Sequence, residues 1–232
     1  MFAESARYYD QLYAFKDYDS ASQKLHEIIR ARRPFAGTLL DVACGTGKHI
    51  EWLRQYYQVE GLDLNPKLLQ IAGTRLPNVA LHLGDMTEFE LGRRFDVITS
   101  LFSSIAYVRT IENFRKTFHC FVRHLNPGGL IILEPWFTPE DYRTDTITAN
   151  FVNESDLKIV WMYTSRRRDR VAIMDIHYMV GTPAGINVFT ELHEMGLFTR
   201  DEYEGAFTDV GLRVEHDPVG LFNRGLYVGV AP

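Results

Sequence analysis

Residues 38–48 constrain the fold more than any other part of the chain. Their sequence, Thr-Leu-Leu-Asp-Val-Ala-Cys-Gly-Thr-Gly-Lys, predicts a buried strand, a turn at Gly45 and Gly47, and a helix that begins at the turn. Because glycine lacks a Cβ, such a turn can adopt conformations closed to other residues and leave room for a ligand. A dinucleotide fingerprint requires G-x-G-x-x-G and a P-loop requires G-x-x-x-x-G-K-[ST], and neither spacing occurs here.

The same stretch resembles the first motif of class I S-adenosyl-L-methionine (SAM) methyltransferases, D-x-[GA]-C-G-T-G. The resemblance implies a Rossmann-like sheet, SAM as cofactor, S-adenosyl-L-homocysteine as product, and no metal ion. It also implies the following cofactor-binding residues: Asp41, Ala43, Gly45, Gly47, Asp63, Leu64, Asp85, Met86 and Phe102. The alternative is a strand-to-helix turn that binds no ligand.

A second acidic residue supports a nucleoside cofactor. Asp63 ends a predicted strand at residues 58–63, and it follows Gly45 by 18 positions (63 − 45 = 18). The carboxyl ends of neighbouring parallel strands face one crevice, so this carboxylate can accept both ribose hydroxyls. By the resemblance, Asp85 would accept the adenine amino group, and Met86 or Leu64 would pack on the ring. The alternatives are that Asp63 caps the helix at Asn65 and that Asp85 closes a turn.

Composition narrows the class of protein. The chain has 232 residues, of which 46% are hydrophobic and 24% charged, which is typical of one globular domain over residues 1–232. A net charge of −5 argues against nucleic acid as a partner. The two cysteines have no metal-ligand spacing and no run is long enough to span a membrane, so we expect no metal, no membrane partner and a cytoplasmic location.

Strands and helices alternate along the first 134 residues. A helix is predicted from Asp19 or Ser20, as N-cap, to a point before Pro34, and amphipathic spacing predicts another at residues 110–125. The predicted strands are nearly continuous apolar runs, at residues 38–42, 58–63, 79–83, 95–101 and 130–133. This pattern predicts a doubly wound α/β fold, with a parallel sheet buried between helices.

The pattern changes after residue 136. Extended segments at residues 157–165, 170–180 and 187–198 predict an antiparallel β insertion over residues 150–198 within the single domain. A helix at 200–210 and strands at 212–216 and 225–230 then resume the main fold. The class I resemblance implies that the last strand is antiparallel. The aromatic residues at positions 1–18 predict a helix packed on the core, or a lid that lines a ligand pocket.

Methyl transfer from a sulfonium requires little acid–base chemistry, because the sulfur is already an excellent leaving group. The protein must align the nucleophile and exclude water. Nucleobase amino-methyltransferases carry [DN]-P-P-[YF] after the fourth strand, whereas this chain has Thr-Ser-Leu-Phe-Ser-Ser at residues 99–104. Exocyclic amines of nucleobases are therefore disfavoured as acceptors.

Several longer motifs resemble the N,N-dimethyltransferases of dTDP-amino sugars in desosamine and mycaminose pathways. They include Phe-Ser-Ser-Ile-Ala-Tyr at residues 102–107, Glu-Pro-Trp at 134–136 and Arg-Gly-Leu-Tyr-Val-Gly at 224–229. The resemblance covers essentially the whole chain, the insertion included. It implies a role in antibiotic biosynthesis and a homodimer in which the inserted sheet participates.

This narrower resemblance also implies roles for individual residues. Ser104 and Tyr107 would lie beside the sugar amine, and Trp136 would shape the sugar pocket. Arg224 would reach the diphosphate, with Arg167 as a second contact. The alternatives are that Tyr107 merely packs at a strand end and that the run of arginines around Arg167 is a solvated hairpin tip.

The chain departs from the family at several positions. Phe2 stands nearest to a tyrosine that some members place by the amine, and Phe137 replaces a second tryptophan. These changes leave open which sugar, which amine position and how many methyl groups are involved. The sequence thus predicts a SAM-dependent N-methyltransferase of a nucleotide-linked amino sugar. The alternatives are a methyltransferase for another small amine or hydroxyl, and a SAM-binding protein without turnover.

Overall fold

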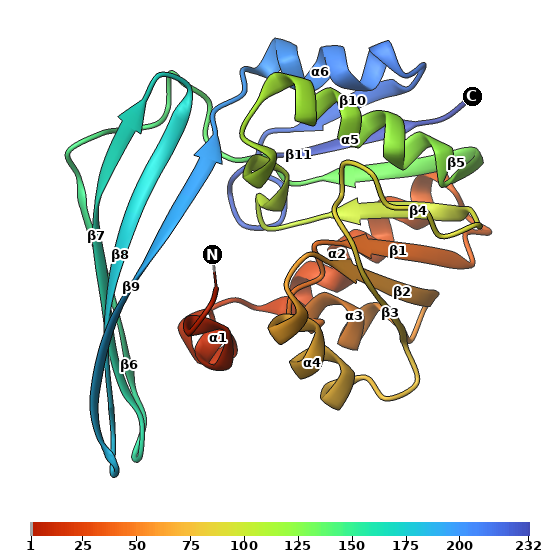
Figure 1. Ribbon diagram of the computed structural model, residues 1–232. Coiled ribbons are helices and arrows are strands. Elements are labelled where there is room, and N and C mark those ends of the chain that lie inside the picture. The colour runs from red at the N-terminus through yellow and green to blue at the C-terminus, as the bar shows by residue number, and fades with distance from the viewer. Residues whose placement is uncertain (1) are drawn as a thin grey trace.

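The computed structural model describes residues 2–232, which form two β-sheets (Figure 1). The larger sheet has seven strands in the order β10-β11-β5-β4-β1-β2-β3. Its strands are β1 (Thr38–Val42), β2 (Gln58–Asp63), β3 (Ala80–Leu83), β4 (Phe95–Ser100), β5 (Leu125–Leu133), β10 (Arg213–Asp217) and β11 (Leu226–Val230). Only β11 among them runs against its neighbours β5 and β10. The predicted mostly parallel sheet with an antiparallel last strand is confirmed.

Helices cover both faces of this sheet, because each strand buries alternate residues on opposite sides. In β1, Leu40 packs in a core with α5 and α6, whereas Leu39 packs in a second core with α2 and α3. The helices are α2 (Tyr18–Arg32), α3 (Lys48–Leu53), α4 (Pro66–Arg75), α5 (Ile111–Arg123) and α6 (Arg200–Asp209), with a short 3-10 helix η2 (Ser104–Val108). The doubly wound arrangement predicted from the apolar runs is therefore present.

The second sheet is antiparallel and has four strands in the order β6-β7-β8-β9. They are β6 (Ile147–Asn153), β7 (Lys158–Arg168), β8 (Val171–Thr182) and β9 (Gly185–Gly196). The sequence predicted only the last three. It missed β6 because this edge strand mixes Ile147 and Phe151 with polar residues, and much of it is exposed.

The N-terminal residues do not form the single helix that was one of the two expectations. They form a 3-10 helix η1 (Ser5–Tyr8) and a one-turn helix α1 (Tyr9–Leu12), and α2 follows. The N-cap of α2 is Asp17, whose side chain accepts a hydrogen bond from the Ser20 N–H, so the predicted cap at Asp19 or Ser20 was wrong. This N-terminal segment lies between the two sheets (Figure 1).

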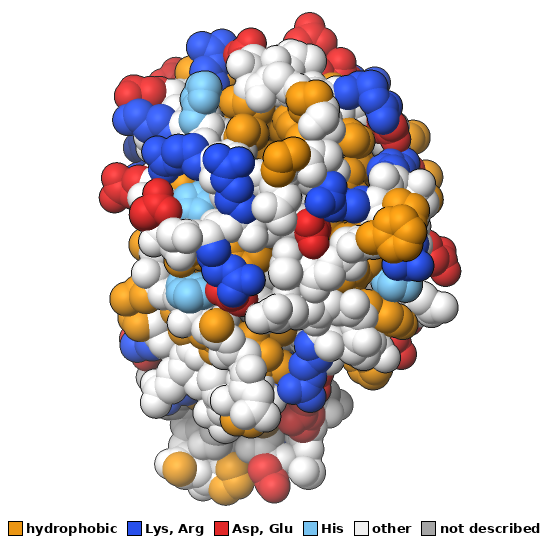
Figure 2. Space-filling model, turned by 90° about the vertical axis from the view of Figure 1, so that its right-hand side faces the viewer, with side chains coloured by type: hydrophobic (Ala, Val, Ile, Leu, Met, Phe, Trp, Pro, Cys, Tyr) orange, Lys and Arg blue, Asp and Glu red, His pale blue; other side chains and the backbone are white. Residues whose placement is uncertain are grey.

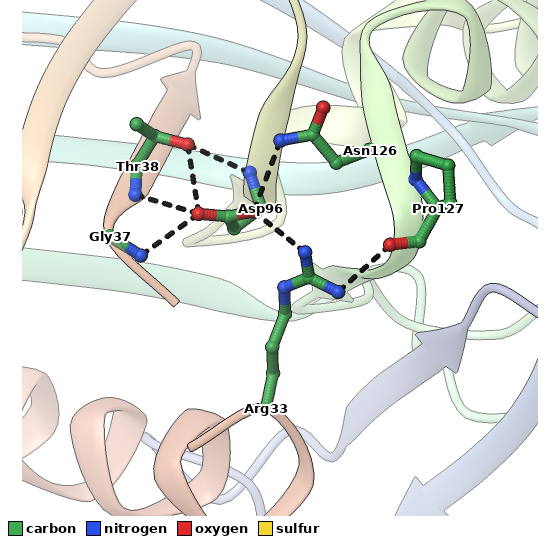
Figure 3. Close-up of polar contacts among 6 residues, drawn as sticks. All are labelled: Arg33, Gly37, Thr38, Asp96, Asn126 and Pro127. Carbon is green, nitrogen blue, oxygen red and sulfur yellow. Dashed lines mark hydrogen bonds and ion pairs between the residues drawn. The ribbon is translucent and has the colours of Figure 1, made fainter. Parts of the chain in front are cut away.

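A polar cluster joins the strands at the edge where they begin (Figure 3). Asp96 of β4 accepts hydrogen bonds from the N–H groups of Gly37 and Thr38, and its carboxylate lies 2.8 Å from the guanidinium of Arg33. Asn126 donates to the same carboxylate from β5. Figure 2 shows this side of the molecule, where basic and acidic side chains lie interspersed. The cluster thus joins three strands to the residue that caps the end of α2, at the edge opposite to the one described next.

Candidate functional site

The carboxyl ends of neighbouring strands β4, β1 and β2 carry the residues that the sequence singled out. Asp41 lies in β1, Asp63 ends β2, and Phe102 follows β4. The arrows of β4 and β5 point toward the inserted sheet, with α1 between the two sheets (Figure 1). The candidate site therefore lies between the sheets and is covered by the N-terminal segment.

The turn after β1 has the left-handed backbone that its glycines suggested. Ala43, Gly45 and Gly47 have φ values of 61°, 57° and 76°. A Cβ at Gly47 would lie 2.5 Å from Cδ1 of Leu76, so close packing against this leucine requires that glycine. Gly45 lines cavities of the site, whereas Gly47 does not. The structure thus places Gly47 away from the cavity walls, although it was predicted to bind the cofactor.

Backbone N–H groups hold the side chain of Asp63 in place by hydrogen bonds. Its two carboxylate oxygens accept hydrogen bonds from the N–H groups of Gly45 and Asn65, each at 2.8 Å. Burial raises the pKa of the Asp63 carboxyl, although these two hydrogen bonds oppose the rise. The side chain lines a first cavity of about 200 Å³. Asp63 therefore orders the start of α4, as the alternative held, and it also presents a fixed carboxyl to the first cavity, where a ribose could be bound.

The first cavity also gathers the residues predicted for the adenine end. Leu64, Asp85 and Met86 line it together with Asp63. Asp85 accepts hydrogen bonds from both the N–H and the hydroxyl of Thr87 through one oxygen, at 2.8 Å each. Asp85 therefore closes a turn, as the alternative held, and this turn fixes its carboxyl at the cavity wall.

Asp41 lies deeper, beneath the glycine turn. Its carboxyl is 2% exposed and accepts a hydrogen bond from the Thr99 hydroxyl at 2.8 Å. Burial raises the pKa of this carboxyl to about 7, against the lowering effect of that hydrogen bond. Together with Ala43 and Gly45 it lines a third, small cavity of about 30 Å³.

A second cavity of about 850 Å³ separates the main sheet from the inserted sheet. Trp136 comes to it from the loop after β5 and Arg224 from the loop before β11, and Trp161 and Tyr163 come from β7. The guanidinium carbon of Arg224 lies 4.8 Å from the centre of the Trp136 ring, in cation–π range. The second cavity is therefore large, aromatic and positively charged at one side.

Lys16 adds another cation to the second cavity. Its Nζ lies 2.8 Å from the centre of the Phe102 ring and has no hydrogen-bond partner among residues 2–232. Burial lowers the pKa of Lys16 to about 7, although the nearby carboxylate of Glu134 opposes this shift. Glu134 itself is fully buried and accepts a hydrogen bond from the Phe102 N–H at 2.6 Å.

All three cavities meet at one point. Tyr9 and Ser104 line each of them, and Phe2 and Tyr107 line the first and second. A group bound in the first cavity therefore faces a group bound in the second across these four side chains. Ser104 and Tyr107 were predicted for such a position, whereas Tyr9 was not assigned to it.

Arg167 is not brought to this site. Its guanidinium donates hydrogen bonds to the backbone carbonyls of Asp169 and Pro139, at 2.5 and 2.9 Å, and the residue lines none of the three cavities. The arginine run forms the end of β7, directly before the tight turn into β8, as the hairpin-tip alternative held. The predicted contact of Arg167 with a diphosphate has no support within this chain.

Other cavity residues were missed by the sequence interpretation. Tyr13, Lys16 and His193 line the second cavity. The clustering of aromatic residues before position 18 was the available signal for the first two, since a lid was one of the two interpretations. His193 gave no signal, because it stands in an ordinary alternating strand.

The cavities fit the cofactor that the glycine motif implies. A buried carboxylate at the end of β2 suits ribose hydroxyls, and the apolar Leu64 and Met86 beside Asp85 suit an adenine ring. Among residues 2–232 no group of three or more His, Cys, Asp and Glu is arranged to hold a metal ion, and no helix is long and apolar enough to cross a membrane. Fold and site together define a class I SAM-dependent methyltransferase.

Comparison with known proteins narrows this class. A family model described as a methyltransferase domain matches residues 39–129. The chain is 39% identical to a dTDP-3-amino-3,4,6-trideoxy-alpha-D-glucopyranose N,N-dimethyltransferase of Streptomyces venezuelae, with 93% of this chain and 92% of that protein aligned. It is 38% identical to a dTDP-4-amino-2,3,4,6-tetradeoxy-D-glucose N,N-dimethyltransferase of Saccharopolyspora spinosa, covering 98% and 92% of the two chains.

A solved structure of a sugar methyltransferase is also similar to this chain. SAM-bound CalS10, an amino pentose methyltransferase from Micromonospora echinaspora involved in calicheamicin biosynthesis, superposes with a TM-score of 0.89 at 36% identity, covering 100% of this chain and 98% of that one. The chain belongs to the family of dTDP-amino-sugar N,N-dimethyltransferases.

Proposed function

We propose that this protein transfers methyl groups from SAM to the amino group of a dTDP-linked amino sugar and adds two of them. The observation that carries the proposal is the meeting of the cavities at Tyr9, Ser104, Phe2 and Tyr107. A nucleoside cofactor held by Asp63 in the first cavity faces an acceptor held in the second. The names of the relatives support the choice of acceptor.

The residues around this junction act by positioning. SAM, when bound, supplies a methyl group on a positively charged sulfur. Ser104 and Tyr107 offer hydroxyl groups that orient the acceptor nitrogen, so that its lone pair points toward the first cavity. The rings of Phe2 and Tyr9, whose centres are 5.2 Å apart, close the junction against water.

The part of the second cavity beside Phe102 and Ser103 suits a diphosphate. Arg224 is held by its hydrogen bond to the Ser103 hydroxyl at 3.2 Å and by the Trp136 ring. Lys16 reaches the same region, because its Nζ lies 2.8 Å and the guanidinium carbon of Arg224 lies 5.7 Å from the centre of the Phe102 ring. Two cations at one side of a cavity favour a doubly charged group.

A homodimer is part of the proposal, supported by one face of the inserted sheet. Phe151, Val160, Met179 and Val188 lie in register across its four strands. Three of these side chains are exposed by half or more, at 66% for Phe151, 50% for Met179 and 62% for Val188. An apolar row of this kind is typical of a surface covered by a partner.

The proposal also includes a cytoplasmic location and a role in antibiotic biosynthesis. Cys44 and Cys120 are buried free thiols, which supports a reducing, cytoplasmic location. The role of CalS10 in calicheamicin biosynthesis supports a role in antibiotic biosynthesis. We also take the whole chain, inserted sheet included, as one functional unit, because residues of β7 and β9 line the second cavity.

The test is a mass-spectrometric methylation assay with SAM and a panel of dTDP-amino sugars that carry the amine at C3 or C4. We expect one sugar to be dimethylated efficiently. Arg224→Ala should raise the KM for that sugar at least tenfold, whereas Arg167→Ala, the matched control, should leave the KM unchanged. No methylated product across the panel would refute the proposed acceptor.

The two alternatives give different results in the same assay. A methyltransferase for another small amine or hydroxyl would methylate acceptors without a diphosphate and tolerate Arg224→Ala. A SAM-binding protein without turnover would bind SAM and transfer no methyl group to any acceptor.

A further inference from the structure

The hydroxyl of Tyr107 connects the cavity junction to a buried pair of side chains on β9. It lies 2.8 Å from Nδ1 of His193, which is 2% exposed. Glu191 precedes His193 by two residues and so projects from the same face of the strand. Its Oε2 lies 3.7 Å from Nε2 of His193. Tyr107, His193 and Glu191 thus form a continuous row that leads away from the cavity.

Glu191 is fixed by the N-terminal segment. One carboxylate oxygen accepts the N–H groups of Glu4 and Ser5, at 2.8 and 3.1 Å, and the other accepts the Ser5 hydroxyl at 2.5 Å. Burial alone would raise the pKa of this carboxyl, but His193, Ser5 and the two N–H groups together hold it well below its ordinary value. The carboxyl is therefore ionised at neutral pH and can only accept hydrogen bonds.

An ionised Glu191 determines the tautomer of His193. The carboxylate faces Nε2 of His193 at 3.7 Å, too far for a hydrogen bond, and its negative charge favours the tautomer with the proton on Nε2 and with Nδ1 as the acceptor. The hydroxyl of Tyr107 must then donate its proton to Nδ1, which leaves its oxygen lone pairs free to accept from a group in the cavity. Burial raises the pKa of Tyr107 well above its ordinary value, so the phenol keeps its proton in the resting protein.

Two successive methyl transfers to one nitrogen require that a proton leave the nitrogen between them. In the first transfer the N–C bond forms as the C–S bond breaks, and the sulfur keeps the electron pair of that bond. The nitrogen is then an ammonium with no lone pair. It must lose a proton before it can accept a second methyl group.

We propose that His193, oriented by Glu191, receives this proton through Tyr107 and so acts as a positioning residue for the second methylation. The inference rests on the proposed function. The Tyr107 oxygen accepts the ammonium proton while its own proton moves to Nδ1 of His193. The products are a neutral methylamine and an imidazolium beside the Glu191 carboxylate, and the imidazolium returns the proton by the same route to water that enters when the products leave.

Carboxyl groups act on the row from two strands. The titratable groups whose charges act on Tyr107 are Tyr13 of the N-terminal segment, Tyr178 of β8, Glu191 of β9 and Asp63 of β2. Two of these are carboxyls, and neither of the other two carries a positive charge in any state. The ring of Phe2 packs edge-on against His193, with centres 4.8 Å apart, and both side chains line the second cavity.

The first test compares His193→Gln, Tyr107→Phe and the double variant in single-turnover assays that resolve monomethylated from dimethylated product. At pH 7 we expect each single variant to slow the second methyl transfer more than tenfold and the first by less, so that monomethylated sugar accumulates. The defect should shrink as the pH rises to 9, where the amine loses its proton to solvent. The double variant should be no slower than Tyr107→Phe alone.

The matched control is His177→Gln, an exposed histidine on neighbouring strand β8. It should leave the product ratio and its pH dependence unchanged. Equal slowing of both transfers by His193→Gln at every pH, or additive effects in the double variant, would overturn the relay.

A second test does not depend on activity. In ¹⁵N-histidine NMR spectra of the unliganded protein, His193 should show a protonated Nε2 and an unprotonated Nδ1, and Tyr107→Phe should shift the Nδ1 resonance. A protonated Nδ1 would overturn the relay even in an active enzyme. A wild-type protein that methylates no dTDP-amino sugar would instead refute the proposed function, and the tautomer would still decide whether the row is built as described.

Discussion

At the scale of single residues, Asp63 is the side chain on which the cofactor assignment depends. Asp63→Ala should weaken binding of S-adenosyl-L-homocysteine by about 2–4 kcal/mol, because paired charge-assisted hydrogen bonds to the ribose are lost. Titration calorimetry measures this directly. Since the carboxylate also accepts from Gly45 and Asn65, the thermal midpoint of Asp63→Asn serves as a control for loss of folding. Unchanged affinity in a folded variant would remove the ribose role.

Lys16 makes a separate prediction about pH. Burial lowers its pKa to about 7, so the free site loses this positive charge as the pH rises through 7. The affinity for dTDP-glucose, whose diphosphate has no ionisation near neutral pH, should fall by about tenfold between pH 6 and pH 8. Lys16→Met should bind weakly at pH 6 and show no such dependence. An affinity independent of pH in the wild type would exclude Lys16 from diphosphate binding.

At the scale of elements, the cluster around Asp96 holds the opposite edge of the sheet (Figure 3). Burial would raise the pKa of this carboxyl, but the Gly37 N–H, Asn126, Arg33 and Thr38 together hold it well below its ordinary value. A carboxyl with a lowered pKa in the folded state stabilises the protein above the unfolded pKa of about 3.9, and this contribution is lost as the pH falls.

Asp96→Asn should therefore lower the free energy of unfolding by about 2 kcal/mol at pH 7, as measured by urea denaturation, because charge-assisted hydrogen bonds are lost. The difference between variant and wild type should narrow as the pH falls below about 4. The affinity for S-adenosyl-L-homocysteine should not change, because the cluster lies at the edge of the sheet away from the cavities. A constant stability difference down to pH 2 would contradict the assigned charge state.

The elements also show how far sequence reasoning reaches. The glycine turn, the start of α4 and the apolar strands were predictable because each depends on local chemistry, such as Asn65 as N-cap with Pro66 in the first turn. Strand β6 was not, because an exposed edge strand has little apolar pattern. The cavity residues from the N-terminal segment and β9 were not either, since their roles depend on contacts between distant parts of the chain, such as that between Ser5 and Glu191, which are 186 residues apart.

At the scale of the whole molecule, the exposed row on the inserted sheet predicts a dimer. Light scattering after size-exclusion chromatography should give twice the chain mass of 26.8 kDa. Met179→Lys, in the middle of the row, should produce monomers, because a charge would be buried in an apolar contact. Thr164→Lys, in β7 toward the far end of the sheet, is the control and should remain dimeric. A monomeric wild type would refute the proposed interface.

The most direct measurement for the whole account is a crystal structure with S-adenosyl-L-homocysteine and a dTDP-amino sugar bound together. The account predicts the ribose of the cofactor product at Asp63 and the sugar amine between the cofactor sulfur and the hydroxyl of Tyr107. It also predicts the diphosphate between Lys16 and Arg224. A cofactor product bound away from Asp63, or an amine that does not face its sulfur, would contradict the account.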